Sequence, residues 1–129
     1  MNVQEINQKI SEINNYLQTC LWMDFEISMM GGSKIVLSGS IDQSVNEYAI
    51  EIEFETPYFI SAIFLWHTDT SKPVISLANE KEFIIMNTRY RVEKGNYIFK
   101  INIEDFDDTP VYIAAQKIDY RIINKTPFQ

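Results

Sequence analysis

The first twenty residues carry a helical pattern. Over residues 3–19, apolar side chains recur at steps of three and four, which places them on one face of a helix. Asn2 followed by Glu5 predicts an N-cap with a reciprocal acidic partner in the first turn. We therefore expect an amphipathic N-terminal helix that lays its apolar face on the rest of the chain. The apolar positions are Val3, Ile6, Ile10, Ile13 and Leu17.

After the helix the period changes to two, which is the pattern of half-buried strands. Residues 25–30 and 34–41 predict two strands joined at Gly31-Gly32, a pair that accepts the backbone angles of a tight hairpin. Residues 48–55 alternate most regularly, and Thr56-Pro57 ends this strand because proline cannot donate to a sheet ladder.

The segment from Tyr58 to Trp66 is apolar on both of its faces. That pattern predicts one long central strand covered on both sides. Further strands are predicted at 74–77, 82–87, 89–93, 97–104 and 111–123, which gives about eight strands between residues 24 and 123. Strands and helices do not alternate, so a parallel sheet is not expected.

These elements together predict a single domain over residues 1–129 with an α+β fold. We expect the N-terminal helix to pack on a mostly antiparallel β-sheet that curls into a sandwich or half-barrel. The 129 residues are 46% hydrophobic, which is enough for a self-sufficient core.

Charge is unevenly distributed along the chain. The net charge of −7 lies in the first 65 residues, which hold nine acidic and two basic side chains, whereas the remainder is neutral. Such a field disfavours nucleic acid and can steer a basic protein toward one face. The alternative is that the acidic strands pair inside the fold with basic residues: Arg89, Arg91, Lys94 and Lys100.

The N-terminal segment, the length of the apolar runs and the number of cysteines bear on the compartment and the oligomeric state. The N-terminus lacks the basic start and apolar run of a signal peptide, and no apolar run approaches the roughly 20 residues of a membrane span. We therefore expect a soluble cytoplasmic protein without a membrane partner. The single cysteine, Cys20, excludes an internal disulfide and leaves a disulfide-linked homodimer open.

Catalytic and metal-binding patterns are weak. His67 is the only histidine, and Cys20 lies near a helix C-terminus, where the dipole raises the pKa of a thiol. The acidic loop 105–108 lacks the glycine and closing glutamate of an EF-hand, and one cysteine with one histidine cannot form a structural zinc site. The sequence therefore predicts a non-enzymatic protein without metal or cofactor.

A row of carboxylates is the most distinctive polar feature. Glu51, Glu53 and Glu55 project from one side of a strand at intervals of roughly 6–7 Å, and Glu47 extends the row. A solvated outer sheet face accounts for this row. The functional interpretation is a docking stripe for a basic protein, because an exposed strand offers no cleft for carboxylate-pair catalysis.

Aromatic residues allow a second function from a different class. Trp66 and Tyr58 would form the stacking surface of a pocket in a small-ligand or carbohydrate-binding β domain. The simpler interpretation is that these aromatics belong to the core.

Several segments together resemble a known group of proteins. They are LWMDFEISMM, KIVLSGSIDQ, NEYAIEIEFETPYFI and YIFKINIEDFDDTPVYIAAQKIDYRI. In the general character of these segments, the chain resembles small bacterial immunity-type proteins of polymorphic toxin systems. The resemblance implies an acidic cytoplasmic inhibitor that neutralises a cognate basic toxin by occlusion. We expect Glu47, Glu51, Glu53 and Glu55 to steer such a partner.

Overall fold

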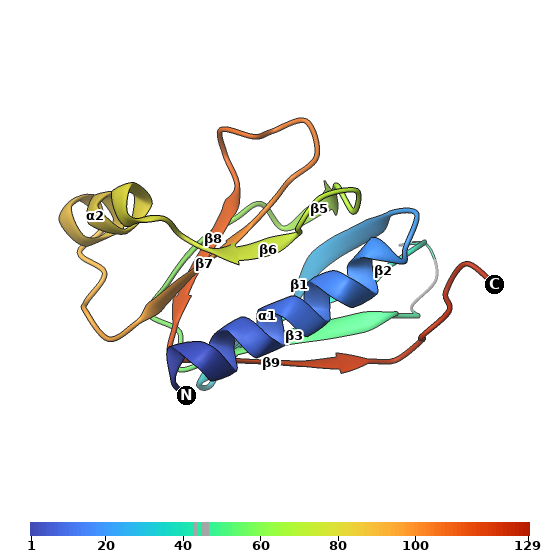
Figure 1. The fold of residues 1–129 in the computed structure, drawn as a ribbon, viewed down its shortest axis with the longest axis horizontal. Coiled ribbons are helices and arrows are strands. Elements are labelled where there is room, and N and C mark those ends of the chain that lie inside the picture. Colours follow the sequence, from blue (N-terminus) through green and yellow to red (C-terminus); the bar gives the residue numbers. More distant parts are fainter. Residues whose placement is uncertain (43, 45–46) are drawn as a thin grey trace.

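The computed structural model describes residues 1–42, 44 and 47–129 (Figure 1). Within them it contains two helices and nine strands, arranged in two antiparallel sheets. The predicted α+β class with an N-terminal helix is therefore confirmed. The elements, in order, are α1 (Val3–Gln18), β1 (Met23–Gly31), β2 (Lys34–Ser40), β3 (Ile50–Glu55), β4 (Phe59–Ser61), β5 (Leu65–Thr68), β6 (Ile75–Leu77), α2 (Glu80–Arg89), β7 (Tyr97–Ile101), β8 (Val111–Ala115) and β9 (Lys117–Ile122).

Helix α1 begins and packs as its sequence predicts. The Asn2 side chain accepts a hydrogen bond from the Glu5 N–H at 2.9 Å, and the Glu5 carboxylate accepts one from the Asn2 N–H at 3.1 Å. The predicted apolar face is buried except at Val3. The helix contacts both β9 and β6, so it closes the side of the core between the two sheets (Figure 1).

Sheet A has the strand order β5-β1-β2-β3-β9. The predicted hairpin joins β1 to β2, with Gly32 at φ +61° in the turn. The alternation predicted over residues 48–55 is confirmed within β3, because Ile50, Ile52 and Phe54 are buried while the glutamates between them remain partly exposed. It does not extend to residues 48–49, because Ala49 is buried like its neighbour Ile50. One face of sheet A therefore covers the main core, and the other faces solvent.

Sheet B has the strand order β4-β8-β7-β6. Its inner face shares the main core with sheet A and α1, through residues such as Phe99 and Ile113. Its outer face carries a smaller apolar cluster, in which Ile98 and Ala114 pack against Met86 of α2. Sheet A and α1 thus cover the inner face of sheet B, and α2 covers part of its outer face.

The prediction of one central strand from Tyr58 to Trp66 was wrong. The segment forms two short edge strands, β4 in sheet B and β5 in sheet A, and the chain crosses between the sheets at residues 62–64. Ile63 and Phe64 remain largely exposed at this crossing. An apolar composition does not show where a chain leaves one sheet for another.

The predicted strand 111–123 is also divided in two, because the chain passes from one sheet to the other within it. Residues up to Ala115 form β8 of sheet B, and those from Lys117 form β9 of sheet A. Between them, the Gln116 N–H donates to the Glu55 carbonyl at 3.1 Å. Two of the predicted strands therefore contain a change of sheet, which a strand pattern alone does not indicate.

The predicted strands 82–87 and 89–93 were also wrong, because helix α2 occupies most of this region. Asn79 caps it, accepting from the Glu82 N–H at 2.8 Å, while the Glu82 carboxylate accepts from the Asn79 N–H at 3.0 Å. This capping box repeats the Asn2–Glu5 pattern, so the sequence held a signal for the helix. None of the helices in the described ranges has the length and apolar character needed to cross a membrane.

Candidate functional site

The carboxylate row lies on the outer face of sheet A, as the alternation of β3 requires. Glu51 pairs with Arg121 of the neighbouring β9, and Glu53 lies 2.6 Å from the Lys34 ammonium nitrogen. Glu55 lies 4.0 Å from the same nitrogen. Glu47 precedes β3 and is exposed. Three of the four predicted docking residues thus pair within the fold.

The cations in these pairs differ from those that the sequence suggested. Lys100 pairs instead with Glu82, at 3.1 Å. The outer face of sheet A still carries more negative than positive side chains. Its carboxylates are Asp24, Glu26, Glu51, Glu53, Glu55 and Asp119, and its cations are Lys34, Lys117 and Arg121. This face therefore contributes to a long-range negative field even though its row is paired.

The two residues proposed for ligand stacking are not brought together. Trp66 is only 3% exposed, and its ring stacks on Phe25 with centroids 6.1 Å apart. Tyr58 precedes β4 of the other sheet, and its hydroxyl donates to the Arg91 carbonyl at 3.0 Å. Trp66 is thus a core residue with no ring face open to a ligand, and the predicted Trp66–Tyr58 pocket was wrong.

A different hollow lies beside α2 on sheet B. It has a volume of about 560 Å³, and we call it the groove. Three large apolar side chains at its margin are strongly exposed: Ile63 at 54%, Phe106 at 60% and Tyr90 at 45%. Its other lining residues are Ser61, Ala62, Met86, Ile103, Asp108, Thr109, Pro110 and Tyr112.

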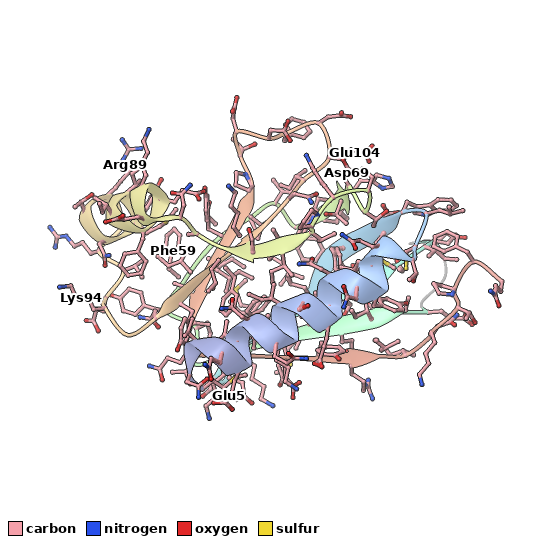
Figure 2. All side chains as sticks on the ribbon, viewed as in Figure 1. Glu5, Phe59, Asp69, Arg89, Lys94 and Glu104 are labelled. Atoms are coloured by element: carbon pink, nitrogen blue, oxygen red, sulfur yellow. The ribbon has the colours of Figure 1, made fainter. Side chains whose placement is uncertain are left out.

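The groove exists because α2 is too short to cover the sheet. Its ten residues bury only Met86 fully, and Phe59 lies beneath the helix, with its ring 5.0 Å from that of Tyr90 (Figure 2). The remaining outer face of sheet B stays open between the helix and the 102–110 segment, drawn in orange in Figure 1. An incompletely covered sheet face is the physical origin of the groove.

The 102–110 segment is held in place at its start by Asn102. Its side-chain oxygen accepts from the Thr68 hydroxyl at 2.7 Å and the Asp69 N–H at 2.9 Å, and its amide donates to the Pro73 carbonyl at 3.0 Å. The Glu104 N–H donates to the His67 carbonyl at 2.8 Å. These contacts tie one wall of the groove to β5, near Asp69 and Glu104 in Figure 2.

That wall is acidic. Asp107 lies 3.2 Å from the Lys72 ammonium nitrogen, whereas Asp105 and Asp108 form no ion pair with any other described residue. Phe106 stands between these carboxylates. Of these carboxylates, Asp108 lines the groove itself, so the groove combines an apolar margin with a negative charge on one side.

His67 and Cys20 do not form a reactive pair. The His67 ring contacts Asp24 through Nδ1, and its Nε2 lies 3.2 Å from a Glu104 oxygen. The Cys20 thiol is buried, which raises its pKa, and it donates to the Tyr16 carbonyl at 3.6 Å. A protonated thiol that is hydrogen-bonded elsewhere is a poor nucleophile.

Metal-ligating side chains are not clustered in the part of the chain that the structure covers. Among residues 1–42, 44 and 47–129, no three His, Cys, Asp or Glu side chains are placed to hold one ion. The 105–108 loop is no exception.

Comparison with known proteins returned no matching family model, no matching curated protein and no matching solved structure. The candidate site therefore depends on geometry alone. Sequence reasoning missed Ile63, Tyr90 and Phe106. One signal was present, since Phe106 is a single aromatic residue within an otherwise acidic loop, where no strand or helix would bury it.

Proposed function

We propose that the protein is a non-enzymatic protein-binding module whose groove receives an apolar side chain of a basic partner. The observation that carries this proposal is the exposure of Ile63, Phe106 and Tyr90 around one 560 Å³ hollow. Contiguous exposed apolar surface is typical of interaction sites, and anchors buried in such hollows supply most of the binding energy of an interface.

Charge supports a basic partner. The chain has a net charge of −7, the groove has an acidic wall, and the outer face of sheet A is predominantly negative. We propose that Glu47, Glu51, Glu53 and Glu55 act at long range, through the field, because three of them already have a cation. Long-range steering raises the association rate more than the affinity.

The resemblance to immunity-type proteins makes a cognate toxin the specific candidate for this partner. The mechanism would be occlusion, in which the module covers the toxin's working surface and needs no chemistry of its own. A small apolar ligand is the second candidate, since the groove volume falls within the range of about 300–1,000 Å³ of ligand pockets.

The experiment is a pull-down from lysate of the source organism with four tagged forms of the protein. They are the wild type, Phe106→Asp, the Glu51→Lys/Glu53→Lys double variant, and Leu21→Asp as a matched control. Leu21 is exposed, like Phe106, but lies outside the groove. Thermal unfolding verifies that each form is folded.

We expect the wild type and Leu21→Asp to retain a stoichiometric basic protein that high salt releases. Phe106→Asp should lower its affinity at least tenfold, because a carboxylate replaces an apolar contact. The double variant should slow association at low salt and leave dissociation unchanged. Equal retention by Phe106→Asp would contradict the groove as the binding site. An empty pull-down together with a thermal shift by small apolar compounds would favour the ligand-binding candidate.

A further inference from the structure

The free edges of the two sheets show how a partner chain can enter the groove. An edge strand presents unpaired backbone N–H and C=O groups, which another extended chain can pair with. Sheet A ends at β5 and β9, and sheet B ends at β4 and β6. Three of these four edges carry polar contacts from the protein's own chain.

Helix α1 supplies the contact on β6. The Asn14 side-chain oxygen accepts from the Val74 and Ile75 N–H groups at 2.9 and 3.0 Å, and its amide donates to the Ile75 carbonyl at 2.8 Å. One asparagine thus takes the place of a neighbouring strand at the start of this edge.

The edges of sheet A are also occupied. On β9, the Asp119 carboxylate accepts from the Tyr120 N–H at 2.9 Å and lies 3.1 Å from the Lys9 ammonium nitrogen. Beside β5, the His67 carbonyl accepts from the Glu104 N–H at 2.8 Å. Strand addition at either edge would have to displace these contacts.

The free edge at β4 differs from the other three edges, because no polar contact from a described side chain covers its backbone. Hydrogen-bonded positions alternate along antiparallel strands. The bond from the Ala78 N–H to the Ile98 carbonyl sets this alternation for sheet B. Followed through the registers of β7, β8 and β4, this alternation directs the backbone N–H and C=O of Ser61 toward β8. It directs the N–H and C=O of Ile60 to the free side of β4, and so also the N–H of Ala62, which lies opposite the Ser61 carbonyl in the same peptide group.

No side chain in the described ranges hydrogen-bonds the backbone of residues 59–63, in contrast to the other three edges. The uncovered edge also runs directly into the groove, which Ser61, Ala62 and Ile63 line. An unprotected edge and an exposed apolar hollow therefore coincide at one place on the surface.

We infer that an extended segment of the basic partner adds to the free edge of β4, with every second side chain directed toward the groove. This inference rests on the proposed function and specifies how the partner binds. Backbone pairing supplies affinity in this mode of recognition, and alternate side chains supply specificity.

Charge complementarity defines the segment. Asp108 lines the groove together with Phe106, and Asp105 directly precedes Phe106 in the chain. Neither carboxylate has an ion-pair partner among the described residues. The segment should therefore carry an aromatic or aliphatic residue with lysine or arginine two positions away, because side chains two apart share a face of a strand.

The probe is the capped hexapeptide Lys-Thr-Phe-Thr-Lys-Thr. Its controls are Glu-Thr-Phe-Thr-Glu-Thr and two forms of the basic peptide, one N-methylated at Lys and Phe and the other N-methylated at Thr. Binding is followed by amide chemical shifts of the protein and by hydrogen exchange at Ile60 and Ala62. The protein variants are Ala62→Pro, which removes a free-edge N–H without removing an internal bond, and Ala62→Val, which keeps it.

We expect the basic peptide to bind at least tenfold more tightly than the acidic one and to slow exchange at Ile60 and Ala62. Only one of the two methylated forms should lose binding, since a strand pairs through one edge. Ala62→Pro should lower affinity at least tenfold with an unchanged unfolding midpoint, and Ala62→Val should not.

Four results would overturn the inference. The first is no binding at about 1 mM peptide, a level at which even a weak complex of about −4 kcal/mol is half-formed. The second is binding that neither methylation nor Ala62→Pro weakens. The third is a homodimer of the wild type that Ala62→Pro dissociates, which would make a second copy the occupant. If Ala62→Pro retains the lysate partner that Phe106→Asp loses, strand addition fails while the proposed function stands.

Discussion

The contact between Asn14 and β6 offers a quantitative test of how helix and sheet are joined. Replacing Asn14 with alanine removes three hydrogen bonds to the backbone of Val74 and Ile75. Asn14 is partly buried in the middle of α1, so water does not freely replace all three contacts. The substitution leaves the apolar face of the helix unchanged.

The magnitude follows from the number of bonds. A typical internal hydrogen bond contributes about 1 kcal/mol net, so three contribute about 3 kcal/mol. Alanine favours the helix by roughly 0.5 kcal/mol over asparagine, which offsets part of the loss. We expect a decrease of about 2–3 kcal/mol in the free energy of unfolding, or a melting temperature lower by roughly 6–12 °C.

Urea denaturation monitored by circular dichroism measures this change. Asn15→Ala is the matched control, because Asn15 has the same helix propensity cost but is exposed and makes no side-chain hydrogen bond to a described residue. Asn14→Asp keeps the two acceptor contacts and loses the donor, so its loss should be smaller. If Asn14→Ala is no more destabilising than Asn15→Ala, the contact does not hold the helix to sheet B.

Two further predictions concern packing and pH. A Cβ at Gly39 would lie 2.9 Å from side-chain carbons of Ile50 and Phe25. Gly39→Ala should therefore lower the free energy of unfolding by about 1–3 kcal/mol, because these side chains must shift. An unchanged midpoint in urea denaturation would show that the core accommodates the methyl group without loss of stability. Burial alone would raise the pKa of the Glu82 carboxyl, but hydrogen bonds from Tyr112, the Asn79 N–H and Lys100 together hold it below its ordinary value of 4.5. A carboxyl whose pKa is lowered in the folded state stabilises the protein at pH values above its unfolded-state pKa. Glu82→Gln should therefore lower the free energy of unfolding by about 1 kcal/mol at neutral pH, and the difference in stability from the wild type should disappear as the pH falls below 4.5. A difference in stability that persists at low pH would contradict this reasoning.

The elements that the sequence predicted well are those whose signals are local. The apolar spacing of α1, its Asn2–Glu5 capping box and the glycine pair of the first hairpin each depend on residues a few positions apart. In α2 the local signals conflicted. Its Asn79–Glu82 box predicts a helix, whereas the continuous run Phe83–Met86 suits a buried strand equally well.

The candidate site could not be predicted in the same way, because its parts come from distant segments. The groove joins residues of the β4–β5 crossing, α2 and the 102–110 loop. Phe64 and Trp66 are two residues apart and both aromatic, yet one is exposed and the other is a core residue. Nothing local distinguishes them, since the difference arises from the passage of the chain between two sheets.

By itself, the sequence determined an acidic α+β protein with an N-terminal helix and antiparallel strands, since periodicity, capping and turn chemistry act over short distances. Only the tertiary structure decided which edge of which sheet stays open and which carboxylates meet a cation. Glu51 and Arg121 pair across 70 residues because β3 and β9 are neighbours. Strand order is set by the packing of the whole chain, and it places the groove beside the uncovered edge of β4.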